Sequence, residues 1–262
     1  MGIVSVKTRT ILKRFSFFAA LVGSVLLAVR VEADPGFALR FKGSNDYVTV
    51  PDAPALDAFP LTITAWVKTL RNTNLVDGIV SKYQDGSFNG YSLLLNNGTL
   101  YAFYSRPGGN LVFAPPLGIN GGFIADGHWH HIAFTISPTG GQLFVDGNLI
   151  NSLGWTGTAG VTTSAEPLQI GRYYTYPNTF QGEIDEVTLW DRALLSSEVN
   201  YLKHRRLGGA EDGLLGYWRF DEGTGVTANN TATNAFHGTT VNAPAWVESH
   251  AAIVLERVAA NV

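Results

Sequence analysis

The segment Leu61-Thr62-Ile63-Thr64-Ala65-Trp66-Val67-Lys68 alternates aliphatic residues with Thr, Trp and Lys. This period of two is typical of a β-strand that has one face on an apolar core. A second segment, Leu143-Phe144-Val145-Asp146-Gly147-Asn148-Leu149-Ile150, places Asp-Gly between two apolar runs. Asp-Gly in this setting is a strong signal for a two-residue hairpin turn. The two segments therefore predict antiparallel β-structure.

The same pattern continues along most of the chain after residue 34. Residues 93–101 form another expected hairpin around Asn97-Gly98. Further short strands are expected at 38–41, 47–50, 79–83, 131–136, 168–170 and 184–190. Because Gly, Asn and Pro separate so many short strands, the pattern favours an all-β sandwich or jelly roll over an α/β fold.

One short helix is expected near residues 196–206. Ser196 is placed to cap its first turn and Glu198 lies within that turn. Its last turn carries Lys203, Arg205 and Arg206, and Gly208-Gly209 ends it. These placements agree with the helix dipole and with the usual stop signals.

Composition excludes several classes of protein. The 262 residues are 45% hydrophobic and 15% charged, which is too apolar for a disordered chain. The formal net charge of −3 offers no basic surplus for a nucleic-acid partner. The chain has no Cys, so a disulfide scaffold, a thiolate zinc site and a cysteine nucleophile are all excluded.

Residues 1–33 have the pattern of a secretory signal peptide. Four basic residues precede an uncharged run over residues 15–29, and Val31-Glu32-Ala33 then offers small residues for cleavage after Ala33. The alternative is an anchoring helix, but a bilayer span needs about 20 apolar residues and Arg30 interrupts too early. We therefore expect a secreted protein, extracellular or periplasmic, with no membrane attachment after cleavage.

Removal of this leader makes the remaining chain distinctly acidic. The leader holds five of the 18 basic residues and one of the 21 acidic residues, which leaves 13 basic and 20 acidic residues and a net charge of −7. An exported domain of this size without Cys also favours a bacterial origin, because extracellular eukaryotic domains usually carry disulfides.

Several motifs, taken together and in order, resemble a laminin-G-like domain of the concanavalin A-like superfamily. They span residues 36–207 and include Ala38-Leu39-Arg40-Phe41, the Leu61–Val67 strand with its tryptophan, Gly127-His128-Trp129-His130-His131, Ile170-Gly171-Arg172, Gly182-Glu183-Ile184-Asp185-Glu186-Val187 and Trp190-Asp191-Arg192-Ala193-Leu194. The resemblance implies a concanavalin A-like jelly roll of antiparallel sheets.

The C-terminal part has an unexpected order. Residues 213–225 and 237–247 resemble the segment that usually begins such a domain. Either 213–247 closes the same sandwich in permuted order, or it opens an incomplete second domain, or it donates a strand to a neighbouring chain. A lone piece of about 35 residues cannot bury its apolar side, which favours closure. We therefore expect one sandwich over 34–247 and a C-terminal tail over 248–262 with no assigned role.

Catalysis is a possibility that the resemblance raises, because the superfamily includes glycoside hydrolases and polysaccharide lyases. A hydrolase needs two carboxylates about 5–10 Å apart. The best local candidate is Glu183-x-Asp185-Glu186, where strand alternation places Glu183 and Asp185 on one face and Glu186 on the other. Position 187 is Val, so a third acid on the same strand is lacking. We expect no catalytic residue.

Three nearby histidines, His128, His130 and His131, could suggest a metal site. No partner pattern such as His-Glu-x-x-His accompanies them, and a zinc site would need further ligands. A structural role is favoured, since this segment is part of the strand signature of the family. A serine nucleophile is disfavoured because no Gly-x-Ser-x-Gly elbow is present.

Calcium is the ion that the resemblance implies, as a structural cofactor. Relatives often hold Ca²⁺ between the first strand and a late strand, which here implicates the Gly43 carbonyl, Asp46 and the Asp185 side chain. The alternative is that Asp46 is a turn residue and that Asp185 is tied to the backbone or to Arg192.

Sugar binding requires aromatic faces that stack on pyranose rings, together with polar groups that contact hydroxyls. The candidates in expected loops are Tyr173, Tyr174, Tyr176, Trp155, Tyr104 and Arg106. The alternative is that such aromatics cover the sandwich edge or fill its core, as is expected for Trp66, Trp190 and Trp218.

These observations favour a non-catalytic binding module, with a polysaccharide, a surface glycoconjugate or a surface protein as its partner. The competing classes are an adhesive protein–protein module without sugar affinity, and a glycan-active hydrolase or lyase. This inference depends mainly on the fold, and one fold hosts many functions.

Overall fold

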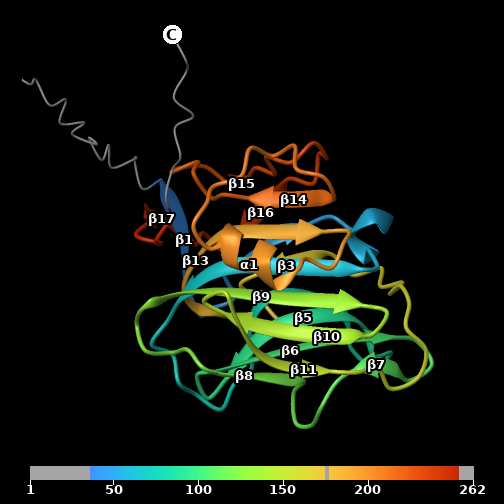
Figure 1. The fold of residues 1–262 in the computed structure, drawn as a ribbon. Helices are drawn as coiled ribbons and strands as arrows, with labels where there is room; N and C mark the ends of the chain where they lie inside the picture. The colour runs from blue at the N-terminus through green and yellow to red at the C-terminus, as the bar shows by residue number, and fades with distance from the viewer. Residues whose placement is uncertain (1–35, 175–176, 254–262) are drawn as a thin grey trace, which may run out of the picture. The chain divides into compact units, whose positions relative to one another are not determined.

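Two antiparallel sheets face each other in the computed structural model, which describes residues 36–174 and 177–253 (Figure 1). The first sheet, sheet A, has the strand order β11 (Asn148–Leu153), β10 (Gly140–Val145), β9 (Trp129–Ser137), β3 (Leu61–Lys68), β13 (Gln181–Trp190), β1 (Phe37–Lys42) and β17 (Ala245–Glu248), and β14 (Leu214–Trp218) also pairs with β13. The expected all-β sandwich is confirmed.

The second sheet, sheet B, contains the remaining strands. Their order is β15 (Thr227–Ala228), β16 (Gly238–Val241), β2 (Tyr47–Val50), β12 (Leu168–Ile170), β4 (Asp77–Gln84), β5 (Asn89–Asn96), β6 (Thr99–Arg106) and β7 (Asn110–Val112), and β8 (Ile119–Phe123) also pairs with β6. A single 3₁₀ turn, η1 (Pro54–Asp57), follows β2. Short β7 and β8 have no clear alternation in the sequence and were not expected.

Both expected hairpins have the turn that their dipeptides favour. Between β10 and β11, Asp146 and Gly147 have φ values of 52° and 78°, and Val145 pairs with Asn148. Between β5 and β6, Asn97 and Gly98 have φ values of 48° and 67°. Two successive positive φ angles define the type I′ turn, whose twist matches that of the flanking strands.

The main core lies between the sheets. Alternate residues of β3, namely Leu61, Ile63, Ala65 and Val67, point into it and are almost fully buried. Trp218 also belongs to this core, whereas Trp190 lies in a second cluster and Trp66 is buried against His131, with ring centroids 5.5 Å apart. The alternation in the sequence thus corresponds to an inner and an outer face, as period two requires.

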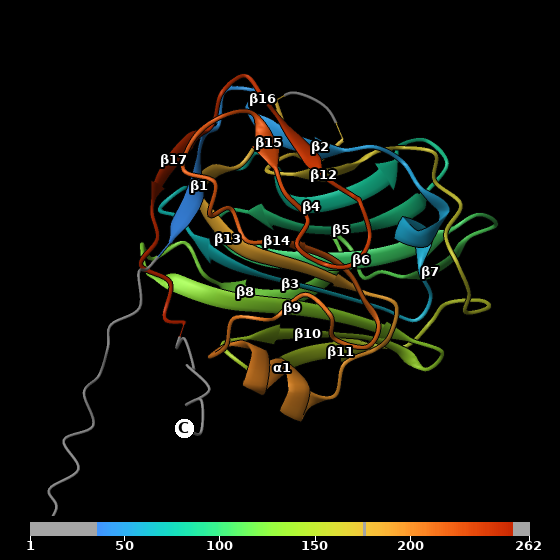
Figure 2. The same cartoon turned by 90° about the horizontal axis from the view of Figure 1, so that it is seen from above.

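The outer face of sheet A is covered by helix α1 (Ser196–Leu202), which Figure 2 shows on the side away from sheet B. The helix is shorter than expected, since Lys203 already caps its C-terminus. Ser196 does not cap it either, because Leu195 is the N-cap residue and its backbone N–H donates to Glu198, 2.7 Å away. Two residues of the helix, Val199 and Leu202, pack against Trp190 and Tyr217 in the second cluster.

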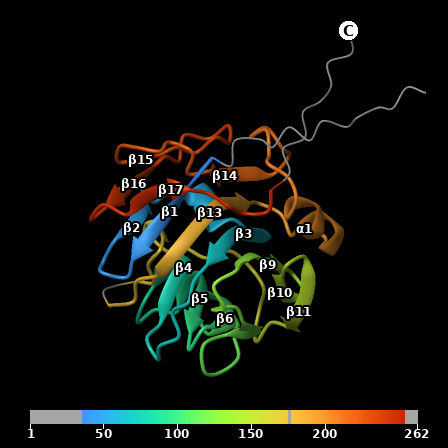
Figure 3. The same cartoon turned by 90° about the vertical axis from the view of Figure 1, so that its left-hand side faces the viewer.

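The C-terminal segment pairs with two strands from the beginning of the domain and with β13. β17 pairs antiparallel with β1, β16 with β2, and β14 with β13. Figure 3 shows the red C-terminal strands beside the blue N-terminal strands at one end of both sheets. The described residues belong to one compact unit.

The predicted signal peptide, residues 1–33, lies outside the described residues. Among the described residues, no helix has the length and the apolar character that a membrane crossing would require.

Candidate functional site

An aromatic cavity of about 400 Å³ lies on the outer face of sheet B. Strand alternation creates it: Leu93 and Leu95 of β5 enter the main core, so Leu94 points outward. Leu94 joins a separate cluster with Tyr83 of β4 and Phe103 of β6. We call the cavity the aromatic pocket; its walls are completed by Phe88, Phe113, Leu117 and Tyr173.

The rings of this pocket support one another. Tyr173 stacks on Tyr83 with centroids 5.6 Å apart and planes 15° apart. The ring of Phe103 makes edge-to-face contacts with Tyr83 and Phe113, with ring centroids 5.0 Å and 6.0 Å apart. Such offset and edge-to-face pairs hold the rings in fixed orientations, so the pocket has rigid apolar walls.

A few polar groups lie at the rim of the aromatic pocket. Asp85, Ser87 and Ser105 line it, and the Ser105 hydroxyl donates to the carbonyl of Phe88. Burial raises the pKa of both Tyr83 and Tyr173, so their hydroxyls stay protonated at neutral pH and can donate hydrogen bonds. Mostly apolar walls with a few polar groups are typical of small-molecule sites.

The predicted ligand residues of the 173–176 loop have different placements. Tyr173 lies in the aromatic pocket. Tyr174 is half-buried with φ of 59°, and its carbonyl accepts a hydrogen bond from Arg172 at 3.1 Å. Tyr176 is outside the described residues.

The other three predicted ligand residues are not in this pocket. Tyr104 is fully buried in the main core, where it stacks on Tyr91 with centroids 6.2 Å apart. Trp155 packs at the sandwich edge, 5.6 Å from the Tyr104 ring, and its indole N–H donates to the Ser137 carbonyl. Arg106 donates to the carbonyls of Thr158 and Ala159 at 3.1 and 3.2 Å. All three residues therefore have contacts within the protein, outside the aromatic pocket.

Sequence reasoning missed Tyr83, Phe103 and Phe113 as site residues. A signal was present in β6, where Leu100, Ala102 and Tyr104 point into the main core while Tyr101 and Phe103 alternate with them. Aromatic residues on the solvent-facing positions of a strand that also has a complete core face indicate a second apolar surface.

The residues expected to hold calcium do not form a common site. Both Asp46 oxygens accept backbone N–H groups of its own turn, from Lys42 at 2.6 Å and Ser44 at 3.1 Å. Asp185 accepts the N–H of Glu186 and the hydroxyl of Ser249. The pairing of β1 with β13 places Asp185 beside Ala38, four residues along β1 from Lys42, which is about 13 Å.

Gly43, whose carbonyl was expected to bind calcium, also leaves space for a neighbouring side chain. It follows β1 with φ of 70°, and a Cβ there would lie 2.5 Å from Nη1 of Arg71. Because Asp46 and Asp185 are separated and each is bonded to protein groups, the residues present do not fit the expected calcium ion. No group of three or more His, Asp or Glu side chains in the described ranges is arranged to hold a metal.

The acids of β13 are placed by a β-bulge. Ile184 and Val187 both enter the main core, although they are three residues apart, and Glu186 has φ of 49°. One extra residue therefore lies between them, and Glu186 shares the outer side with Asp185. The expectation that Glu186 faces the opposite side is wrong for this reason.

Both acids of the bulge are buried and have partners. Glu186 pairs with Arg206 at 2.8 Å and accepts the hydroxyl of Tyr217. Burial raises the pKa of Asp185 and of Glu186. The pair joins β13 to β14 and to the segment after α1.

The histidines are held by carboxylates and by the core. His130 lies between two acids, with Nδ1 2.8 Å from Asp146 and Nε2 3.1 Å from Asp126. Burial lowers the pKa of His131 to about 3, so its ring is neutral and apolar in character. His128 is exposed. The arrangement is that of an ion-paired structural segment.

Two solved structures from other organisms have a similar fold. A proposed carbohydrate-binding protein from Bacteroides ovatus superposes with a TM-score of 0.62 at 19% identity, covering 84% of this chain and 61% of that chain. A heptameric SAP-like pentraxin from Limulus polyphemus has a TM-score of 0.54 at 14% identity, covering 84% and 98%. At such identities the likeness shows the fold alone.

A sequence relative and a family model extend this likeness. The mouse Sushi, von Willebrand factor type A, EGF and pentraxin domain-containing protein 1 is 28% identical over 183 residues, which cover 65% of this chain and only 5% of the mouse protein. The model of the Laminin_G_3 family matches residues 42–200. The chain therefore belongs to the Laminin_G_3 family of the concanavalin A-like lectin/glucanases superfamily.

Proposed function

We propose that this protein is a non-catalytic module that binds a glycan in the aromatic pocket. The observation that carries the proposal is an open cavity whose walls are the rings of Tyr83, Phe103, Phe113 and Tyr173. The C–H faces of a pyranose ring pack well on flat aromatic faces, and the rim groups Asp85 and Ser87 can contact its hydroxyls. The pocket volume of about 400 Å³ lies in the range of small-ligand sites.

The rigidity of the pocket supports a binding role. Tyr173 comes from the loop after β12, whereas Tyr83 and Phe103 come from neighbouring regions of sheet B, and ring pairing orders all three. Because these side chains are ordered before a ligand arrives, little conformational entropy is lost on binding. The proposed carbohydrate binding of the structurally similar Bacteroides ovatus protein agrees with this ligand class.

The two acids of the β13 bulge support a binding role over hydrolysis. Asp185 is fully buried and Glu186 is 6% exposed, and each is bonded to protein groups. A glycosidase needs two carboxyl groups that flank an accessible sugar. We further propose that residues 34–262 act outside the cytoplasm after removal of the predicted leader.

Glycan-array binding of the purified protein tests this function, followed by affinity measurements with two tyrosine variants. Tyr173→Ala removes one wall of the aromatic pocket, and we expect it to weaken binding of an array hit about tenfold. Tyr201→Ala is the matched control, because Tyr201 is an exposed tyrosine on α1 at the other sheet. We expect this control to bind like the wild type.

Two results would contradict the proposal. The first is a protein that binds no glycan on the array, which would favour the adhesive protein–protein class. The second is a Tyr173→Ala variant whose affinity equals that of Tyr201→Ala, which would place the sugar elsewhere.

A further inference from the structure

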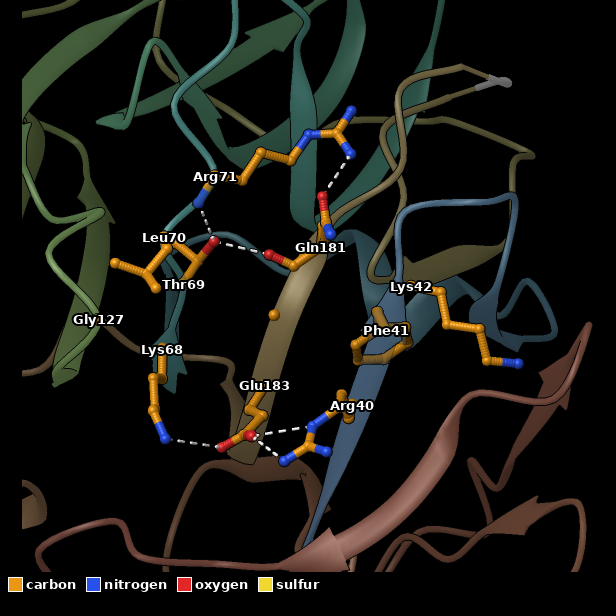
Figure 4. Close-up of a pocket in the computed structure, with 11 residues that line it drawn as sticks. Arg40, Phe41, Lys42, Lys68, Thr69, Leu70, Arg71, Gly127, Gln181 and Glu183 are labelled. Atoms are coloured by element: carbon orange, nitrogen blue, oxygen red, sulfur yellow. Dashed lines mark hydrogen bonds and ion pairs between the residues drawn. The ribbon is translucent and has the colours of Figure 1, made fainter.

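A second cavity, of about 540 Å³, lies where β1 and β3 of sheet A end and β13 begins (Figure 4). Eleven residues line it, and five of them carry charge. Four of the five are positive and one is negative: Arg40, Lys42, Lys68, Arg71 and Glu183. We call this cavity the cationic pocket.

The charge of this pocket opposes that of the chain around it. Residues 34–262 carry 13 basic and 20 acidic residues. Four of those 13 basic residues line this one cavity. Like charges gathered in a concave site raise the local potential and attract ligands of the opposite sign.

One carboxylate is shared between two of the cations. Glu183 accepts from Nε and Nη2 of Arg40 at 3.0 and 2.7 Å, and from Nζ of Lys68 at 3.4 Å. Figure 4 shows Glu183 between the two cations at one end of the pocket. The side chains of Arg40 and Lys68 remain 56% and 35% exposed. One positive charge of this trio is therefore not neutralised, and both cations remain accessible to a ligand.

The guanidinium of Arg71 is fixed at the opposite end of the pocket. Its Nη1 donates to Oε1 of Gln181 at 3.2 Å, and its Nε lies 3.0 Å from Oδ2 of Asp77. Gly43 leaves room for it, since any Cβ there would collide with Nη1. The ammonium of Lys42 points away and donates to the Ala243 carbonyl at 2.8 Å, so Lys42 contributes charge but not a direct contact.

We infer that the cationic pocket binds an acidic sugar unit, with its oxyanion group at Arg40 and Lys68 and its ring extending toward Arg71. Arginine forks suit the planar or tetrahedral oxygens of a carboxylate or a sulfate ester. The cavity is large enough for a ring together with its charged group. The sugar part of this inference rests on the proposed function, whereas the oxyanion part rests on the pocket alone.

Calorimetric titration with glucuronate, with a sulfated glucose and with neutral glucose tests the inference. We expect the acidic sugars to bind more tightly than glucose, with affinity that falls as salt is added. Lys68→Gln should weaken their binding about tenfold, because one charge-assisted hydrogen bond is lost. Lys68→Arg should retain binding, and Arg219→Gln, which removes one positive charge outside the pocket, should leave it unchanged.

The three sugars separate the sources of the oxyanion. Binding of glucuronate alone assigns a uronic acid, and binding of the sulfated sugar alone assigns a sulfate ester. Equal binding of glucose, or equal losses in Lys68→Gln and Arg219→Gln, overturns the inference. Tyr173→Ala should keep its affinity for the acidic sugars, so that failure of the aromatic pocket as a glycan site can be distinguished from failure here.

Discussion

The outer faces of the two sheets both carry aromatic and aliphatic side chains, but only one of them is covered. On sheet A, Trp190, Leu194 and Tyr217 are buried with α1. On sheet B, Tyr83, Leu94 and Phe103 form a cluster that stays open as the aromatic pocket, with no helix over it in the described part of the chain. Residues of the same kind thus stabilise the fold where they are covered and form a candidate binding site where they are not.

The largest expected effect is that of removing the C-terminal segment that completes the covered side. A chain that ends at Asp212 loses Leu214 and Tyr217 from the covered cluster and Trp218 from the main core, together with the strands that pair with β1 and β2. We expect this truncated protein to be insoluble or unfolded, without a cooperative thermal transition by circular dichroism. A folded fragment would show that 213–247 is not needed to close the sandwich.

Two single substitutions compare the faces directly. Trp190→Ala on the covered face should lower the free energy of unfolding by about 3–5 kcal/mol, since it leaves a large cavity under α1. Tyr173→Ala on the open face should lower it by only about 1 kcal/mol, since the ring lies at the pocket wall. Urea unfolding of both variants measures the difference. Equal losses would mean that the open face is as important for stability as the covered one.

The fold could be read from the sequence because its signals are local. The period of two in β3 and the Asp-Gly and Asn-Gly turns fixed the positions of strands that the structure contains. The bulge at Glu186 could not be read in this way, because an extra residue in a strand depends on the register of its partners, β3 and β14. The same applies to the end of α1, which stops at Leu202 although a basic last turn extends further in the sequence.

The candidate site was predicted only in part. Tyr173 was identified from its loop, but its stacking partner Tyr83 lies 90 residues earlier in the chain, and pairing of β12 with β4 brings the two regions together. Tyr104 was misplaced because sequence alone does not show which face of β6 enters the core. The cationic pocket was not predicted, since its charges come from three separate strands and one loop.

The ionisable groups of the two sheets extend the comparison. Asp77 of β4 is buried, and burial raises its pKa to about 6 although Arg71 opposes the shift. Because the folded state holds this proton more tightly than the unfolded state does, protonation of Asp77 stabilises the fold. This contribution is complete below pH 3.8 and is lost as the pH rises through about 6. The loss amounts to about 3 kcal/mol.

Asp77→Asn tests this effect because an amide does not titrate. The free energy of unfolding of the wild type, measured relative to the variant, should fall by about 2 kcal/mol between about pH 4 and pH 7. Chemical denaturation across this range provides the measurement. A difference that is constant with pH would contradict the assignment to Asp77.

The smallest expected effect concerns His130 of β9 in sheet A. Burial lowers its pKa, but the hydrogen bonds to Asp146 and Asp126 offset this and leave the pKa above its usual value of 6.5. Its stabilising contribution is therefore complete below pH 6.5 and is lost as the pH rises through the raised pKa. We expect His130→Gln to lower the free energy of unfolding by about 1 kcal/mol at acidic pH and by less at alkaline pH, because the His130–Asp146 pair is only partly shielded from water.

The neighbouring exposed histidine gives the matched control, His128→Gln, whose effect on the free energy of unfolding should be small at every pH. If His130→Gln lost the same stability at both ends of the range, the histidine would contribute by packing rather than by its charge.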